Sequence, residues 1–210
     1  MMKHRPMLLT KLLQYSSGRH REVIGLIGTH HGVGVTHTAL LLAFYFGEEL
    51  GRKTALVELN PHKDMQLIEQ VYEWNKNEND TFSFHRITCY KEVKADQIPQ
   101  ILGKDYEYVI IDFGTDFALQ QEEFLRCSSK IVIGGQSEWD ILKLKEFRKR
   151  TELIGGSEHW LYYLVRAKSR TIARLRKEVK NKIWAVPDIQ EPTRGSNDTR
   201  TLFQQCFPLN

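Results

Sequence analysis

A glycine-rich turn between a short apolar run and a helix-forming segment constrains the fold of this chain more than any other feature. The apolar run, residues 22–28, reads EVIGLIG and ends in the turn, residues 28–38. Residues 38–50 then contain no proline and no glycine except Gly47, and they are apolar almost all round, as expected of a helix packed between a sheet and its neighbours. Such a turn directs backbone N–H groups and a helix N-terminus at one point, which favours an anion.

Further short apolar runs alternate with segments of helical length along the rest of the chain. This alternation predicts an α/β fold with a mostly parallel sheet flanked by helices on both faces. The polar residues 75–80 predict a surface loop, and residues 82–90, of mixed polarity, predict an edge strand. The other expected strands are 53–59, 106–113, 130–134, 160–165 and 182–186, and further helices are expected at 64–74 and 198–206.

Length and composition favour one domain. With 210 residues, of which 41% are hydrophobic and 27% charged, the chain is long enough for one full core. We therefore expect a single domain at 22–210 after a basic leader at 1–21. The longest apolar stretches, such as 39–46, are far shorter than the roughly 20 residues that cross a bilayer. Because the leader also lacks a cleavage site of small residues, we expect a cytoplasmic protein, either free or at the membrane surface.

Positive charge is clustered in two segments. Residues 1–21 contain lysines and arginines but no acid, and residues 166–182 contain Glu178 as their only acid. The second segment is either a solvated helix face or a contact for DNA or an acidic membrane. The leader is either an amphipathic helix on a membrane or a partner, a terminal helix docked on the domain, or a frayed tail.

The glycine turn keeps only part of a phosphate-binding loop. Such a loop has a lysine after its last glycine, which reaches the β- and γ-phosphates, and then a serine or threonine for magnesium. Here Gly34 is followed by Val35 and Thr36, so the magnesium position is kept and the lysine is missing. The turn is therefore either a weakened nucleotide site or a strand-to-helix turn that binds nothing.

The loop and the strands around it resemble a known family. The GVG-T loop, the second strand ending in Glu58-Leu59-Asn60-Pro61, and the later run Val109-Ile110-Ile111-Asp112 are similar to the deviant Walker P-loop proteins MinD and ParA. The form of the loop most resembles the degenerate TadZ/CpaE-like proteins of pilus and secretion machines. The resemblance, which begins near Val23, implies a P-loop NTPase fold, ATP and magnesium as cofactors, and a homodimer that sandwiches nucleotide.

This sequence departs from the family's loop at both lysines. The signature lysine of the family falls on His30 and its general phosphate lysine falls on Val35. Its opening glycine falls on Thr29, and a further loop glycine falls on His31. Phosphoryl transfer depends on positive charge placed against the phosphate, so the loss of both lysines predicts little turnover unless a distant Lys130 or Lys168 replaces them.

The acidic positions of the family are partly kept. Asp112 matches the Walker B aspartate, which helps to organise magnesium, and it is the candidate catalytic residue if the protein is active. The acidic pair after the second strand corresponds to Glu58 and Asn60. The resemblance thus implies Thr36, Glu58 and Asp112 as magnesium ligands, although Asp112 and Glu58 are equally well explained as structural acids at strand ends.

The candidate nucleotide site is one continuous segment of the loop. Its histidines could donate to phosphate in a pH-dependent way or simply face solvent. A metal site made by the histidines themselves is not expected, because no third ligand lies at a suitable spacing. The predicted nucleotide-binding residues are His30, His31, Gly32, Val33, Gly34, Val35, Thr36 and His37.

Three functions fit these features. The leading hypothesis is a nucleotide-binding pseudo-ATPase that acts as a localisation or assembly factor, with pilus or secretion proteins as partners. The second is a slow ParA-like ATPase that holds DNA or an acidic membrane through segments 1–21 and 166–182. The third is an interaction domain that binds no nucleotide.

Overall fold

The computed structural model describes residues 21–72, 75–76 and 80–208. The predicted leader, except for Arg21, the end of the helix expected at 64–74, and residues 77–79 of the predicted loop at 75–80 lie outside the described residues. The first two residues of that loop form a short strand instead, because Asn75 and Lys76 pair antiparallel with Ser83 and Phe82. Arg21 belongs to the folded part of the chain, because its Nε donates to the backbone oxygen of Tyr106 at 3.0 Å.

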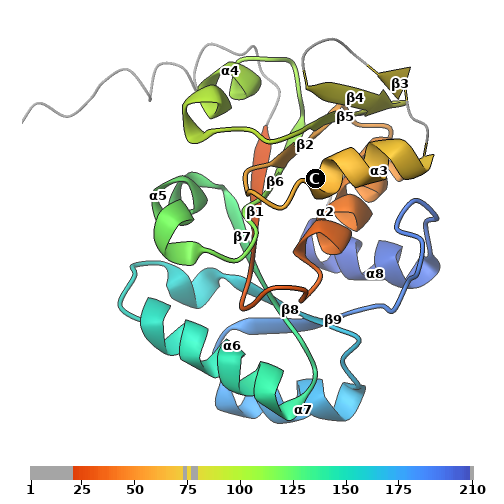
Figure 1. Ribbon diagram of the computed structural model, residues 1–210. Helices are drawn as coiled ribbons and strands as arrows, with labels where there is room; N and C mark the ends of the chain where they lie inside the picture. The colour runs from red at the N-terminus through yellow and green to blue at the C-terminus, as the bar shows by residue number, and fades with distance from the viewer. Residues whose placement is uncertain (1–20, 73–74, 77–79, 209–210) are drawn as a thin grey trace, which may run out of the picture.

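A nine-stranded sheet with the order β3-β4-β5-β2-β6-β1-β7-β8-β9 organises the chain (Figure 1). The strands from β5 to β9 in this order pair in parallel, and the mostly parallel sheet predicted from the sequence is confirmed. The strands are β1 (Glu22–Gly28), β2 (Thr54–Glu58), β3 (Asn75–Lys76), β4 (Thr81–Phe84), β5 (Ile87–Tyr90), β6 (Tyr108–Asp112), β7 (Ser129–Gly134), β8 (Leu161–Val165) and β9 (Lys182–Val186).

The segment expected to be one edge strand, residues 82–90, is a hairpin instead. Strand β4 pairs antiparallel with β5, and β5 pairs in parallel with β2, so β5 lies inside the sheet. The chain reverses at His85, which adopts a positive φ of 47°. Ile87 and Cys89 of β5 are fully buried, which explains why this half of the segment joins the sheet interior.

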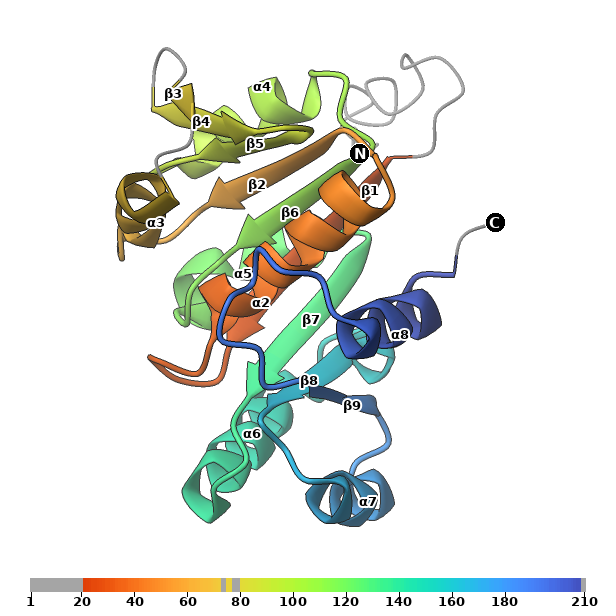
Figure 2. The ribbon, with the colours of Figure 1, turned by 90° about the vertical axis from the view of Figure 1, so that its right-hand side faces the viewer.

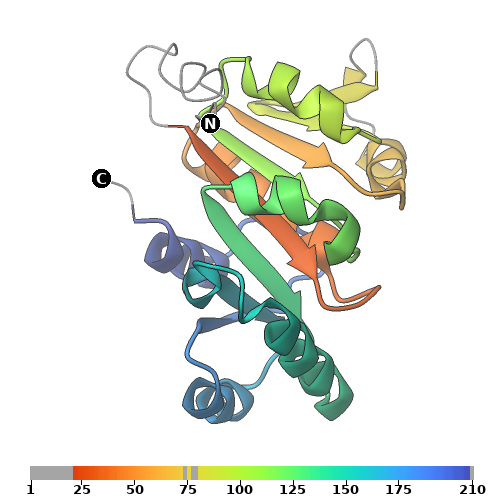
Figure 3. The ribbon, with the colours of Figure 1, turned by 90° about the vertical axis from the view of Figure 1, so that its left-hand side faces the viewer.

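Helices cover both faces of the sheet, as predicted. One face carries α2, α3 and α8 (Figure 2), and the other carries α4, α5, α6 and α7 (Figure 3). None of the helices in the described ranges is long and apolar enough to cross a membrane. The helices are α2 (Val35–Phe44), α3 (Asp64–Tyr72), α4 (Ile98–Leu102), α5 (Phe117–Arg126), α6 (Glu138–Thr151), α7 (Ser169–Glu178) and α8 (Asn197–Cys206), with short turns η1 (Tyr45–Glu49), η2 (Ala95–Gln97) and η3 (Ser157–His159).

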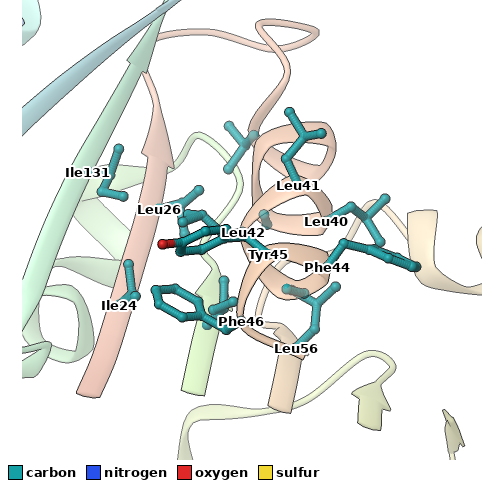
Figure 4. Packing of buried hydrophobic residues seen from close by; sticks show 14 of the residues in the cluster. Ile24, Leu26, Leu40, Leu41, Leu42, Phe44, Tyr45, Phe46, Leu56 and Ile131 are labelled. Atoms are coloured by element: carbon teal, nitrogen blue, oxygen red, sulfur yellow. The ribbon is translucent and has the colours of Figure 1, made fainter. Parts of the chain in front are cut away.

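Helix α2 is buried between the sheet and α8, which accounts for its apolar surface on all sides. Its Leu42, and the following Tyr45 and Phe46, face Ile24 and Leu26 of β1 (Figure 4). The Tyr45 ring, in the turn η1 that follows α2, also lies 5.3 Å from that of Phe203 in α8. This packing fixes the position of the loop that precedes α2.

Candidate functional site

The glycine turn lies at the carboxyl edge of the parallel strands, between the ends of β6 and β7. Gly28 N donates to Gly114 O at 2.8 Å, and Thr29 N donates to Ile133 O at 3.0 Å. Gly32 and Gly34 have φ values of 75° and 98°, in the left-handed region that favours glycine. Loops at this edge of an open α/β sheet are the usual place for ligands.

The N-terminus of α2 is open to an anion. The N-cap residue Gly34 has no side chain, and no acidic residue lies in the first turn. In contrast, α5, α6 and α8 are capped by Asp116, Ser137 and Ser196 respectively. The first N–H groups of a helix have no intrahelical acceptor, so those of α2 are available to phosphate oxygens.

A cavity of about 610 Å³ opens beside this helix terminus. The loop after β1, the start of α6, the end of β8 and residues 187–190 after β9 form its walls. Four segments far apart in the sequence therefore meet at one point. The volume lies within the range of small-molecule sites, and its position next to the α2 terminus suits a phosphorylated ligand.

Val35 occupies the lysine position as part of the core. Its side chain is only 6% exposed, and a Cβ added to Gly28 would lie 2.7 Å from Val35 Cγ2 and 2.8 Å from Val33 Cγ1. Both valines therefore pack against the end of β1. Apolar packing has taken the place that a lysine would need for reaching a phosphate.

Thr36, Asp64 and Asp112 form a polar cluster at the start of α2. Thr36 Oγ1 lies 2.6 Å from Asp112 Oδ2 and 3.1 Å from Asp64 Oδ2, and Gly114 N donates to Asp112 Oδ1 at 2.9 Å. Burial raises the pKa of Asp112, the negative charge of Asp64 raises it further, and the bonds from Thr36 and Gly114 oppose this. The sequence reasoning did not identify Asp64, although an acid at a helix start after the second strand was a usable signal.

Glu58 and Asn60 hold the backbone around this cluster. The two carboxylate oxygens of Glu58 accept hydrogen bonds from Met65 N and Glu92 N, both at 3.2 Å. Burial raises the pKa of Glu58, and these bonds lower it in part. Asn60 Nδ2 donates to Asp112 O at 3.1 Å, so the family's acidic pair is replaced here by groups that order the loops after β2 and β6.

Thr36 and Asp112 could hold a magnesium ion only together with a phosphate. In the described parts of the chain, no group of three or more His, Cys, Asp or Glu side chains is arranged to hold a metal. Thr36 and Asp112 nevertheless offer the hard oxygen atoms that magnesium prefers, next to the anion-binding helix terminus. Magnesium would then complete its shell with phosphate oxygens and water.

Two of the loop histidines, His30 and His37, have pKa values below the ordinary value of 6.5. Burial lowers the pKa of His30, Lys143 lowers it further, and Asp140 opposes this. His30 Nε2 lies 3.1 Å from Asp140 Oδ1 in α6, which fixes the position of the ring. Burial also lowers the pKa of His37, whereas His31 is exposed with its ring 5.0 Å from that of His62.

The distant lysines do not replace the missing ones. Lys130 Nζ donates to Cys127 O at 2.5 Å near the start of β7, at the edge of the sheet opposite the loop. Lys168 is exposed at the start of α7 and does not line the cavity. Arg166, at the end of β8, does line it. Sequence reasoning placed Arg166 in a basic segment but not in the site.

The comparisons with known proteins agree with this architecture. No family model and no curated protein sequence matches the chain. The structure is similar to a putative plasmid partition protein from Borrelia burgdorferi bound to AMPPNP, with a TM-score of 0.64 at 12% identity over 90% of this chain and 100% of that chain. It is also similar to a ParA family ATPase from Chlorobium tepidum, with a TM-score of 0.63 at 14% identity over 90% and 94% of the two chains.

A third similar structure is the septum site-determining protein MinD from Pyrococcus horikoshii, complexed with Mg-ADP. Its TM-score is 0.55 at 15% identity, over 80% of this chain and 82% of that chain. At these identities the likeness establishes the fold. The chain has the α/β architecture of ParA- and MinD-type P-loop ATPases, as the loop motif predicted.

Proposed function

We propose that this protein binds ATP with magnesium at the α2 terminus and acts as a pseudo-ATPase in localisation or assembly. One observation carries the proposal: the loop keeps an uncapped helix terminus beside a cavity, while Val35 is packed into the core where the phosphate lysine would stand. Anion binding by main-chain N–H groups survives the loss of the lysine. Stabilisation of the charge that develops during phosphoryl transfer is lost with the lysine.

The expected loss of hydrolysis is large. Removing one preorganised donor to a developing charge lowers turnover by about 10²–10³-fold in well-studied enzymes. His30 and His37 do not compensate at neutral pH, because burial lowers the pKa of each ring. Nucleotide binding rather than hydrolysis is therefore the activity that this site supports best.

We further propose that the protein forms a homodimer through the carboxyl edge of the sheet. Helices α3, α5 and α6 follow strands of the sheet and so begin at this edge. Near their starts Leu67, Leu119 and Trp139 are exposed by 59%, 73% and 66%. Large apolar side chains that surround a site on three elements favour a protein contact there. The pilus or secretion role rests on the resemblance of the loop to TadZ/CpaE-like proteins.

A second candidate function is a slow ATPase that holds DNA or an acidic membrane surface. Helix α7 and its flanks carry Lys168, Arg170, Lys177 and Lys180, all exposed, and no carboxylate within the described residues pairs with them. Arg174 of the same helix is paired with Glu138 at 3.1 Å. Unpaired cations on one helix can supply non-specific affinity for phosphates of a polymer.

Calorimetry with ATP and magnesium tests the first proposal. The variant Gly34→Gln places a side chain in the loop, and Gly156→Gln is its matched control, because Gly156 has a similar φ of 83° and lies in open space. Both variants carry a comparable backbone strain, which thermal unfolding reports. We expect binding to the wild type and to the control, and at least a tenfold loss in Gly34→Gln.

Hydrolysis separates the first two functions. We expect phosphate release by the wild type to be at background, and Val35→Lys to raise it, since a lysine stem can lie on the apolar wall with its ammonium in the cavity. Release that is well above background in the wild type and is lost in Asp112→Ala would support the slow ATPase. Equal binding to Gly34→Gln and the wild type would contradict the proposed site.

A further inference from the structure

We propose that Arg166 supplies the positive charge for the nucleotide phosphates in place of the missing lysines, and that Asp188 competes with the phosphates for it. This inference rests on the proposed nucleotide site and assigns the cation that binds there. Arg166 ends up beside the loop because β8 lies next to β7 in the sheet. The ligand class is a polyphosphate or its nucleotide ester.

Arg166 lies close to the helix terminus where the phosphates are proposed to bind. Arg166 directly follows Val165, and Val165 Cγ2 would lie 3.5 Å from a Cβ added to Gly34, so the end of β8 approaches the N-cap of α2. Among the described residues that line the cavity, Arg166 is the only lysine or arginine. Its φ of 59° is uncommon for a residue with a side chain, and such backbone positions cluster at functional sites.

Arg166 also carries the kind of charge that a polyphosphate requires. A polyphosphate needs positive charge that persists at neutral pH, and among the described residues that line the cavity no lysine and no second arginine supplies it. A guanidinium is always protonated and presents several donors in a planar fork that matches phosphate oxygens. The loop N–H groups and Arg166 would therefore approach the phosphates from two walls of the same cavity.

The present partner of Arg166 is an exposed carboxylate. Arg166 Nε donates to Asp188 Oδ1 at 3.2 Å, and both side chains are more than two-thirds exposed, at 69% and 68%. Exposed pairs of this kind contribute little to stability, so a more highly charged anion can displace the carboxylate. Asp188 also lines the cavity, where its charge would repel phosphate.

Binding of two probes tests the inference. ATP with magnesium and inorganic tripolyphosphate are titrated into the wild type, Arg166→Gln, Asp188→Asn and the control Arg170→Gln, which removes the same charge from an exposed position outside the cavity. We expect Arg166→Gln to weaken both probes about tenfold or more. Asp188→Asn should tighten both by up to about fivefold. Arg170→Gln should stay within about twofold of the wild type.

The outcomes separate this inference from the proposed function. If Arg166→Gln binds both probes as the wild type does, the inference is overturned and the nucleotide site stands. If only ATP binding weakens, Arg166 contacts the nucleoside, which overturns the phosphate assignment. Tripolyphosphate binding that depends on Arg166, without any ATP binding, supports the inference and rejects the proposed function. If neither probe binds to the wild type or to Asp188→Asn, both are overturned.

Discussion

Asp112 lies in the candidate site, and the burial of its carboxyl group makes the free energy of unfolding depend on pH. Because burial raises its pKa, the folded state binds the proton more tightly than the unfolded chain does. Its contribution to stability is therefore fully present below the unfolded pKa, about 3.9, and is lost as pH rises through the folded pKa. Above the folded pKa the carboxylate is buried as a charge, with Asp64 nearby.

We expect Asp112→Asn to raise the free energy of unfolding by about 1 kcal/mol at pH 8 and to give no gain at pH 4. The asparagine can still accept from Gly114 N, and the Thr36 hydroxyl can turn to accept from the amide. Urea unfolding at both pH values measures the effect, with Asp116→Asn at the exposed N-cap of α5 as control. An equal gain at both pH values would rule out ionisation as the cause.

The loop histidines predict how anion binding changes with pH. His30 faces Asp140 and Lys143, and His37 faces Arg166 and Asp188. Since burial lowers both pKa values from 6.5, each ring gains charge only at mildly acidic pH. We expect the ratio of tripolyphosphate affinities, wild type over the His30→Gln, His37→Gln double variant, to rise as pH falls below 6.5. An affinity that rises by the same factor in the double variant would contradict this.

At the scale of elements, one close contact limits how α2 ends. Helix α2 continues into the π-helical turn η1, where Leu50 N donates to Tyr45 O at 3.0 Å. A Cβ on Gly47 in this turn would lie 2.3 Å from Ile87 Cγ1 of β5. The missing side chain therefore allows the helix end to approach the sheet.

We expect Gly47→Ala to lower the free energy of unfolding by about 1–3 kcal/mol, as overpacked cores usually do. Urea unfolding measures this loss, and Gly155→Ala, in open space, is the control with an effect within about 0.5 kcal/mol. In an Ile87→Ala background the same substitution should cost less, because the clashing atom is gone. Additive losses in the double variant would exclude the Ile87 contact as the cause.

The strands that sequence patterns predicted are mostly those inside the sheet, whose residues are covered on both faces. Strands β1, β2, β6, β7, β8 and β9 are short apolar runs because helices cover both sides of the sheet. The hairpin of β4 and β5 was missed because its turn, at His85 and Arg86, contains neither glycine nor proline. Arg166, Asp64 and Asp188 were missed as site residues because the fold, rather than their spacing, brings them to the loop.

For the whole molecule, the proposed dimer has its contact at the carboxyl edge of the sheet, where the proposed nucleotide site also lies. His30, at the position of the signature lysine in the family that the loop resembles, contacts Asp140 of the same chain, so the proposed dimer would rely on apolar contact. Leu119 and Trp139 offer that contact at the starts of α5 and α6. Leu153 is 94% exposed but lies beyond the other end of α6, away from this edge.

We therefore expect light scattering to report twice the chain mass of 24.6 kDa in ATP and magnesium. Leu119→Glu and Trp139→Glu should each shift the protein to monomer, because a charge buried in an apolar contact is costly. Leu153→Glu adds the same charge at a still more exposed leucine away from this edge and should leave the dimer intact. A dimer that persists in both edge variants, or is lost in Leu153→Glu, would place the contact elsewhere. If Gly34→Gln still forms a dimer in ATP and magnesium, dimerisation does not require nucleotide binding at this loop.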